Sequence, residues 1–165
     1  MARNEELRRA WQIVESTGIN IFLTGKAGTG KTTFLRTLKE KLPKRMIVVA
    51  PTGIAAVNAK GVTIHSFFQL PLSPFVPGSS FQGNQRSHFR FSKQKINIIR
   101  SIDLLVIDEI SMVRADLLDA IDDALRRFRR SRLPFGGVQL LMIGDLQQLA
   151  PVVKDDEWSM LSKYY

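Results

Sequence analysis

The segment Gly25–Thr32 constrains the fold of this chain more than any other stretch. Its residues fit the pattern G-x-x-x-x-G-K-[ST]. An apolar run at 19–23 precedes it, and residues 33–38 have the pattern of a helix. A glycine-rich loop between a buried strand and a helix brings backbone N–H groups close to a polyphosphate, because glycine adopts conformations that other residues avoid. The segment therefore predicts an α/β fold with a phosphate-binding loop; an ordinary glycine-rich turn is the alternative.

This loop assigns chemistry to individual residues. The start of the following helix adds positive dipole where the phosphates would lie. Lys31 has the length to reach the β- and γ-phosphates, and the Thr32 hydroxyl is suited to hold Mg²⁺. The expected nucleotide contacts are Gly25, Ala27, Gly28, Thr29, Gly30, Lys31, Thr32 and Thr33.

Composition limits the class of protein. A chain of 165 residues with 44% hydrophobic and 24% charged residues fits one globular domain. There is no cysteine, which excludes disulfides and thiolate metal sites. No apolar run reaches the ~18 residues of a membrane span, and the first residues lack the apolar core of a signal peptide. We therefore expect a cytoplasmic location and no membrane partner.

The formal net charge of +9 is concentrated in one interval of the chain. No Asp or Glu occurs between Glu40 and Asp103, while the rest of the chain is balanced. The basic residues of this interval are Lys41, Lys44, Arg45, Lys60, Arg86, Arg90, Lys93, Lys95 and Arg100. Such an asymmetry favours a polyanionic partner, most simply nucleic acid, over a merely solvated surface. Arg86, Arg90, Lys93 and Lys95 are interleaved with His88, Phe89 and Phe91, so we expect these basic residues to contact a single strand. The alternative for Phe89 and Phe91 is that they pack inward and only hold the insertion against the domain.

Apolar periodicity predicts alternating strands and helices. Strands are expected at 19–23, 46–50, 103–107 and 138–143, and helices at 4–17, 33–42, 54–59 and around 117–128. In the first helix, Trp11 is expected to pack against the core. Residues 71–95 are rich in Pro, Gly and Ser and predict a loop-rich insertion, with a short hairpin around Phe89 and Phe91 and regular structure resuming near Ile96. Alternation of this kind predicts a parallel sheet with helices on both faces.

Polar residues follow two further predicted strands. In parallel α/β sheets ligands bind outside the carboxyl ends of the strands. Asp108 ends the strand at 103–107, where its carboxylate can hold Mg²⁺. Glu109 is the candidate for polarising the attacking water, and Gln148, after the last strand, is the candidate γ-phosphate sensor. A helix start stabilised by acidic residues is the structural alternative for Asp108 and Glu109.

Phosphoryl transfer commonly also needs an arginine, and none follows Gln148. The basic run 126–130 ends a predicted helix that starts near the site and points away from it. We therefore expect this run not to reach the nucleotide.

Four segments together resemble the ATP-binding half of superfamily 1 DNA helicases of the Pif-type, RecD-like branch. They are Gly25–Thr32, residues 50–56 with 63–67, residues 106–112 and residues 144–152, in the order of helicase motifs I, Ia, II and III. The resemblance spans roughly residues 19 to 158. The combination is far more specific than any one motif.

The resemblance implies a P-loop NTPase fold. Residues 1–165 would form one RecA-like domain, with the insertion at 71–95, from an ATP-driven helicase that moves 5′ to 3′ along single-stranded DNA. It also implies the roles given above for Lys31, Thr32, Asp108, Glu109 and Gln148. It implies DNA contact near Thr52, Gly53, Thr63 and His65, although a lone histidine such as His65 is as often packed or capped.

Three departures from the family pattern matter. The second RecA-like domain and its arginines are absent, so the chain is expected to be a fragment. Gln12 is the nearest candidate for an adenine-reading glutamine, and Ala150 stands where proline is frequent. A nucleotide-switched nucleic-acid-binding module without significant turnover therefore remains the alternative to a helicase motor domain.

Overall fold

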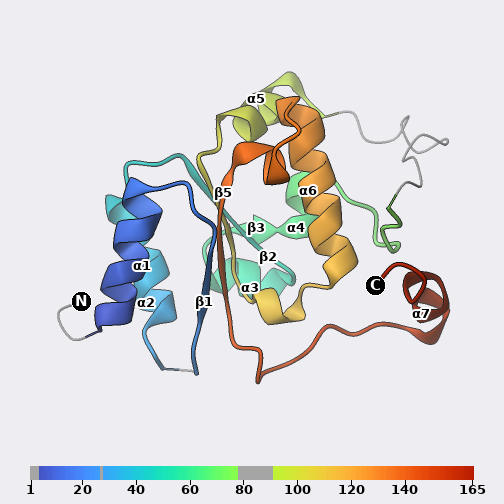
Figure 1. The fold of residues 1–165 in the computed structure, drawn as a ribbon, viewed down its shortest axis with the longest axis horizontal. Helices are drawn as coiled ribbons and strands as arrows, with labels where there is room; N and C mark the ends of the chain where they lie inside the picture. Colours follow the sequence, from blue (N-terminus) through green and yellow to red (C-terminus); the bar gives the residue numbers. More distant parts are fainter. Residues whose placement is uncertain (1–3, 27, 78–90) are drawn as a thin grey trace.

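The computed structural model describes residues 4–26, 28–77 and 91–165, in which helices and strands alternate along the chain (Figure 1). Ala27, Arg86, His88, Phe89 and Arg90, named above as candidate contacts, lie outside the described residues. The elements are α1 (Glu5–Ser16), β1 (Ile21–Thr24), α2 (Lys31–Lys41), β2 (Met46–Ala50), α3 (Gly53–Asn58), β3 (Val62–Thr63), α4 (Ile64–Phe68), α5 (Lys93–Ser101), β4 (Leu104–Ile107), η2 (Ile110–Met112, a 3-10 helix), α6 (Ala115–Arg129), η3 (Pro134–Gly137, a 3-10 helix), β5 (Gln139–Gly144) and α7 (Asp155–Leu161).

The strands form one five-stranded sheet in the order β1-β5-β4-β2-β3. Every pairing between neighbours is parallel, which confirms the predicted α/β class. All four residues of β4 are buried, as expected for a central parallel strand covered on both faces. Since parallel strands end at one edge of the sheet, the chain segments after β1, β4 and β5 meet there.

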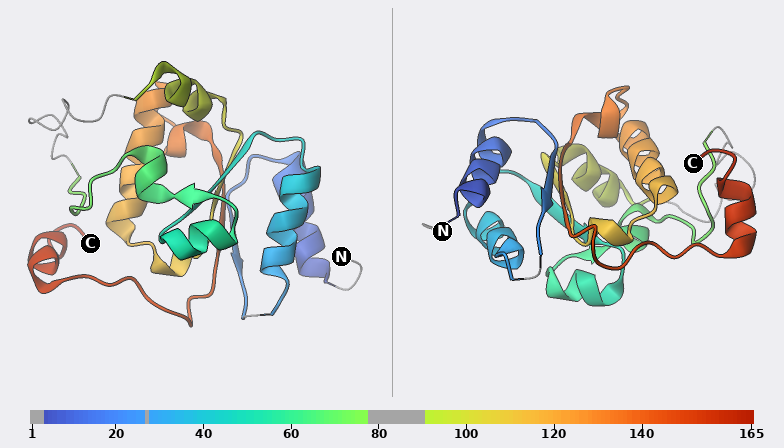
Figure 2. Two further views of the ribbon diagram at one scale, coloured as in Figure 1. Left: turned by 180° about the vertical axis from the view of Figure 1, so that it is seen from behind. Right: turned by 60° about the horizontal axis from the view of Figure 1, so that its bottom comes forward.

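The core has two layers, one on each face of the sheet. Alternate residues of β4 divide between them: Leu105 and Ile107 pack with α4, α5 and α6, whereas Leu104 and Val106 pack with α1 and α2. The two views in Figure 2 show α1 and α2 on one side of the sheet and α5 and α6 on the other. Trp11 packs against the second layer as expected, edge-on to Phe34 with 6.5 Å between ring centroids.

Two sequence expectations need correction. The apolar run at 19–23 predicts a buried strand, but β1 is an edge strand in which Phe22 is 41% exposed. Apolar composition does not reveal how many neighbours a strand has. Regular structure resumes at Lys93, earlier than Ile96, because the Ser92 hydroxyl accepts a hydrogen bond from the Lys95 N–H at 3.1 Å and caps α5.

Among the described residues, no helix combines the length and the apolar character needed to span a bilayer. Between α4 and α5, the described residues 69–77 form neither helix nor strand.

Candidate active site

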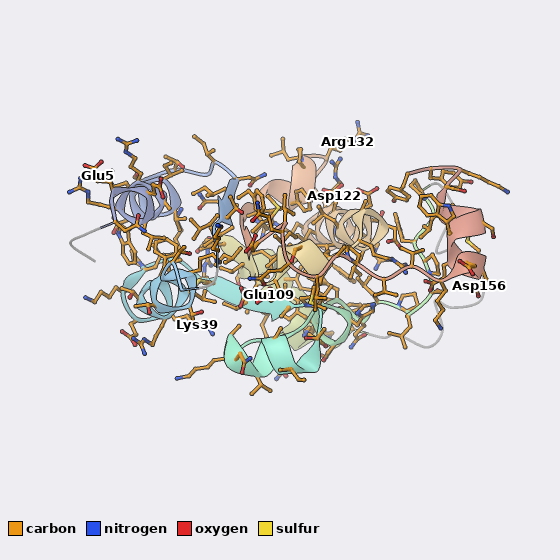
Figure 3. The ribbon with its side chains drawn as sticks, turned by 90° about the horizontal axis from the view of Figure 1, so that it is seen from below. Glu5, Lys39, Glu109, Asp122, Arg132 and Asp156 are labelled. Carbon is orange, nitrogen blue, oxygen red and sulfur yellow. The ribbon has the colours of Figure 1, made fainter. Side chains whose placement is uncertain are left out.

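Three chain segments converge at the carboxyl ends of the strands and enclose a cavity of about 420 Å³. They are the loop between β1 and α2, the turn after β4, and the turn after β5; Figure 3 views this edge from below, with Glu109 near its centre. The cavity is lined by Gly28, Gly30, Lys31, Thr32, Thr33, Asp108, Glu109, Ile143, Gly144, Asp145 and Gln148. Most of the side chains predicted for nucleotide chemistry therefore lie together.

Backbone conformation explains the glycines of the first segment. Gly28 and Gly30 have φ of 81° and 91°, a region that favours glycine over residues with a Cβ. Gly30 is also the N-cap of α2, so the free N–H groups of the first helical turn face the cavity region. Gly25 and Thr29 do not line the cavity but hold the loop, since the Thr29 hydroxyl donates to the Lys26 carbonyl at 2.9 Å.

The Lys31 ammonium lies over this loop. It donates to the carbonyl oxygens of Gly25 and Lys26, the second at 2.9 Å. Phosphate oxygens can replace these two carbonyl oxygens as partners of the Lys31 ammonium, because both kinds of oxygen accept hydrogen bonds. Lys31 is the only cationic side chain among the described residues that line the cavity.

Asp108 lies directly after β4 and is half-buried. Burial raises the pKa of its carboxyl group, opposed by the hydrogen bond that the Glu109 N–H donates at 3.1 Å and by the charges of Lys31 and Lys39. The Asp108 carboxylate and the Thr32 hydroxyl, which belong to residues lining the same cavity, offer the oxygen ligands that Mg²⁺ prefers. In the described part of the chain, no cluster of three or more acidic or histidine side chains forms a complete metal cage. Mg²⁺ commonly takes most of its ligands from phosphate and water instead.

Glu109 has an unusual backbone conformation, with φ 53° and ψ 46°. A left-handed conformation at a residue other than Gly, Asn or Asp is energetically unfavourable and is concentrated at functional sites. Here it lies in the turn that follows β4, and the adjacent residues Asp108 and Glu109 both line the cavity. This geometry fits the predicted separation of metal binding from water activation.

The turn after β5 positions Gln148 through a residue that sequence reasoning did not single out. Asp145 is only 7% exposed, and its carboxylate accepts from the Gln147 N–H at 3.0 Å and from Gln148 Nε2 at 3.3 Å. The signal available in the sequence was a lone aspartate directly after an apolar strand.

The residues predicted to contact DNA separate into two groups. Thr52 and His65 line a second cavity of about 230 Å³ beside the first two turns of α6. Thr52 and Thr63 also cap helices, accepting hydrogen bonds from the N–H groups of Ala55 and Ser66, each at 3.2 Å. Burial and the nearby Arg114 lower the pKa of His65, which keeps its ring neutral at pH 7. Lys93 does not line this cavity; it begins α5 and is exposed.

A buried ion network forms one wall of the second cavity and was not predicted. The Arg114 guanidinium binds both carboxylate oxygens of Asp116, at 2.8 and 2.7 Å, and Glu157 at 2.8 Å. Asp116 also accepts from the Phe75 N–H at 3.1 Å. The network therefore joins residues 71–77, the start of α6 and α7, which are far apart in the sequence.

Two other sequence expectations have clear outcomes. Gln12 is exposed on α1 and does not line the cavity. Arg129, in the basic run 126–130, donates to the carbonyls of Ile99, Arg100 and Ile102, so it holds α5 against α6. In the part of the chain that the structure describes, no arginine lines the active-site cavity, which agrees with the expectation for this run.

Comparison with known proteins places this geometry in a family. The model for PIF1-like helicases matches residues 4–162. An ATP-dependent DNA helicase PIF1 from Candida albicans is 41% identical over 142 residues, covering 84% of this chain and 15% of the relative. A crystal structure of Pif1 from a Bacteroides species in complex with ADP-AlF4 is 48% identical with a TM-score of 0.91, covering all of this chain and 37% of that one. Bacteroides Pif1 bound to ssDNA matches with a TM-score of 0.90 and the same identity. The chain thus spans well under half the length of these relatives.

Proposed function

Because the chain belongs to the PIF1-like helicase family, we propose that it is the ATP-binding motor domain of an ATP-dependent DNA helicase. In the parent protein it would couple ATP hydrolysis to 5′–3′ movement along single-stranded DNA. The observation that carries this proposal is the convergence of Lys31, Asp108 and Gln148 on one cavity of about 420 Å³ from three separate strand ends.

Each residue of the cavity has a defined task in this proposal. Lys31 and the N–H groups at the start of α2 bind the phosphates of ATP, and Thr32 and Asp108 hold Mg²⁺. The metal, when bound, supplies charge neutralisation at the phosphates. Glu109 orients the attacking water and accepts its proton, while Gln148 donates to the γ-phosphate. Asp145 acts as a positioning residue because it holds the Gln148 amide.

Among the described residues, no arginine lines the cavity. We infer that these residues neutralise only part of the charge that develops on the γ-phosphate. A second RecA-like domain of the parent would supply that arginine and the other half of the DNA track. The chain by itself therefore resembles a nucleotide-switched binding module, with slow turnover that DNA hardly stimulates.

The DNA would pass over the same edge of the sheet as the nucleotide. The second cavity lies there, and its lining includes Thr52 and His65 together with the residues that follow α4. A neutral His65 can donate or accept one hydrogen bond and can stack on a base. This surface would contact the strand close enough to the turn carrying Glu109 for the two sites to influence each other.

Calorimetric titration of MgATP and MgADP tests the nucleotide site. Lys31→Ala is expected to lower affinity at least about tenfold because it removes a charged hydrogen-bond donor from the phosphates. Arg132→Ala, an exposed change outside every cavity described above, serves as the matched control. Equal affinity in the wild type and Lys31→Ala would overturn the proposed site.

A phosphate-release assay with and without oligo-dT tests the proposed incompleteness. We expect turnover far below one per second and little stimulation by DNA. Turnover of several per second would show that this chain holds a complete catalytic site and would refute the need for an arginine from a second domain.

A further inference from the structure

The edge of the sheet at β3 carries an open groove of about 510 Å³ that shares no lining residue with the active-site cavity. Its sides come from the end of α2, from Lys60 and β3, and from α5. The left view of Figure 2 shows β3 on the near side of the sheet, with α2 to its right and α5 above. The groove is therefore a separate surface of the molecule.

The lining of this groove is basic. Lys39, Lys44, Lys60 and Lys95 line it, and none of the described lining residues is acidic. Three of these four lysines fall in the acid-free interval 41–102, whose charge was unexplained by the active site. Four ammonium groups around one groove attract a polyanion by summed potential.

Two of the lysines are free to bind a ligand. Lys44 donates to the carbonyls of Val14 and Thr17 and to Gln139, and Lys39 donates to the carbonyls of Ala59 and Lys60. Among the described residues, by contrast, the Lys60 ammonium makes no hydrogen bond or ion pair, and the Lys95 ammonium lies 4.0 Å from the centre of the Phe67 ring. Lys60 and Lys95 therefore supply unused donors, while Lys39 and Lys44 supply fixed charge.

The floor of the groove is apolar and partly accessible. Val62 on β3 and Ile98 on α5 are 43% and 44% exposed, beside Met46 of β2. A duplex offers only phosphates and sugars at its outer rim, and its bases are stacked inside. A single strand has unstacked bases that can lie on an apolar floor while its phosphates reach the lysines. The groove volume is in the range of small-ligand sites, about 300–1,000 Å³, which suits one or two nucleotides.

A smaller cavity of about 200 Å³ lies between this groove and the active site and shares lining residues with each. It is lined by Thr32 and Thr33, which also line the active-site cavity, and by Lys39 and Lys60, which also line the groove. Helix α2 therefore has Lys31 at one end, in the nucleotide cavity, and Lys39 two turns later, in the groove. The charge of Lys39 also acts on Asp108.

We propose that the groove at the β3 edge is a second binding site for single-stranded DNA, in which Lys60 and Lys95 contact phosphates and the apolar floor receives bases. The proposal rests on the proposed function for the identity of the polymer, but of the residues that line the groove only Phe67 belongs to the four helicase-like segments. A single strand bound in this groove would influence the nucleotide cavity through α2, which carries a lining residue of each site.

The test is fluorescence anisotropy of a labelled oligo-dT across a salt series with the whole chain. The double variant Lys60→Glu/Lys95→Glu is compared with Arg132→Glu/Lys163→Glu, which makes the same change in formal charge at exposed positions outside the groove. Each phosphate contact contributes about −0.7 to the slope of log affinity against log salt. We expect the groove variant to flatten the slope by about 1.4 and to weaken binding at least about tenfold at 50 mM salt, while the control changes neither.

Two further measurements separate the groove from the nucleotide site and from local packing. MgATP affinity is expected to be unchanged in the groove variant, because the groove and the nucleotide cavity share no lining residue. Lys95→Glu could act by disturbing the packing of Lys95 on Phe67, and Lys60→Gln/Lys95→Gln controls for this because it removes the two charges without reversing them. We expect the Gln variant to flatten the salt slope by the same amount as the Glu variant.

Several results would overturn the proposal. If the groove variant behaves like the control, the groove proposal is refuted while the proposed nucleotide site is unaffected. If the wild-type chain binds no single strand at all, the proposed DNA partner is refuted as well. Equal binding of duplex of the same length would contradict the role of the apolar floor. Displacement of the oligonucleotide by polyglutamate of equal charge would identify an acidic protein segment as the occupant instead.

Discussion

The ion network around Arg114 gives a quantitative prediction about stability. Asp116 is 3% exposed, and Arg114 binds both of its oxygens while remaining 19% exposed itself. Arg114→Met keeps the length and apolar stem of the side chain but leaves Asp116 with backbone hydrogen bonds from Phe75 and Leu117 and without its cation. Removing one partner of a buried ion pair costs about 3–5 kcal/mol.

Partial exposure of Arg114 and the remaining Phe75 hydrogen bond reduce that cost, so we expect the free energy of unfolding to fall by about 2–3 kcal/mol. For a chain of this size each kcal/mol lowers Tm by about 2–4 °C, which gives a decrease of roughly 4–12 °C. Urea denaturation at pH 7 measures the free energy, and Arg132→Met at an exposed position is the matched control.

The pH dependence of the difference identifies its cause. Burial is the largest single influence on Asp116 and raises its pKa, but the hydrogen bonds and charge of Arg114, together with the backbone hydrogen bonds from Phe75 and Leu117, outweigh burial and hold the pKa below its ordinary value. The wild-type contribution is therefore present above pH 4 and is lost as the pH falls further. Without Arg114 we expect burial to outweigh the backbone hydrogen bonds from Phe75 and Leu117, so the pKa of Asp116 should rise and the variant should regain stability as the carboxyl group becomes protonated.

We therefore expect the deficit of Arg114→Met to shrink between pH 7 and pH 4, and Arg114→Met/Asp116→Asn to recover much of it at pH 7. A deficit below 0.5 kcal/mol at pH 7, or one that does not change with pH, would refute the assignment of a buried, compensated charge.

Two other predictions concern packing and surface charge. Gly144→Ala is expected to destabilise the fold by about 1–3 kcal/mol and to weaken nucleotide binding. The new Cβ would lie 2.8 Å from Ile110 Cγ2 and 3.1 Å from the Ile110 nitrogen, and Ile110 directly follows Glu109. Urea denaturation and calorimetry measure both effects; Gly18→Ala, with no atom within 4 Å of the added Cβ, is the control, and identical values for the two variants would disprove the steric argument. Hydrogen bonds from the Arg45 guanidinium and N–H lower the pKa of Asp103 to about 2, so Asp103→Asn should reduce stability above pH 4, and this deficit should shrink as the pH falls from 4 through about 2. Thermal unfolding across that range measures the difference, and a deficit that does not shrink on acidification would rule out this ionisation as its source.

Local patterns predicted the elements and the first set of site residues. Apolar runs located the four longer strands, and the motifs after β1, β4 and β5 brought Lys31, Asp108 and Gln148 to one edge, because parallel strands end together. The roles proposed for these residues in catalysis and DNA binding stay predictions.

Features that depend on contacts between distant segments were not predictable. The exposure of Phe22 follows from the position of β1 at the edge of the sheet, which no local pattern reveals. No local pattern marks Arg114, Asp116 and Glu157 as partners, since the ion pair between Arg114 and Glu157 spans 43 positions of sequence. Gln12 has a suitable side chain, but it is exposed on α1 and does not line the active-site cavity.

The order of strands also has a consequence for how the chain is made. Among the described residues β1 pairs only with β5, and Ile21 finds its partner in Leu141, 120 residues later. A ribosome adding about 5–20 residues per second needs roughly 6–24 s to synthesise that interval. During this time β2 and β4 can already pair, but the strand that carries the phosphate-binding loop has no neighbour. The loop thus leaves the ribosome well before β5 and acquires its native support only after β5 has followed.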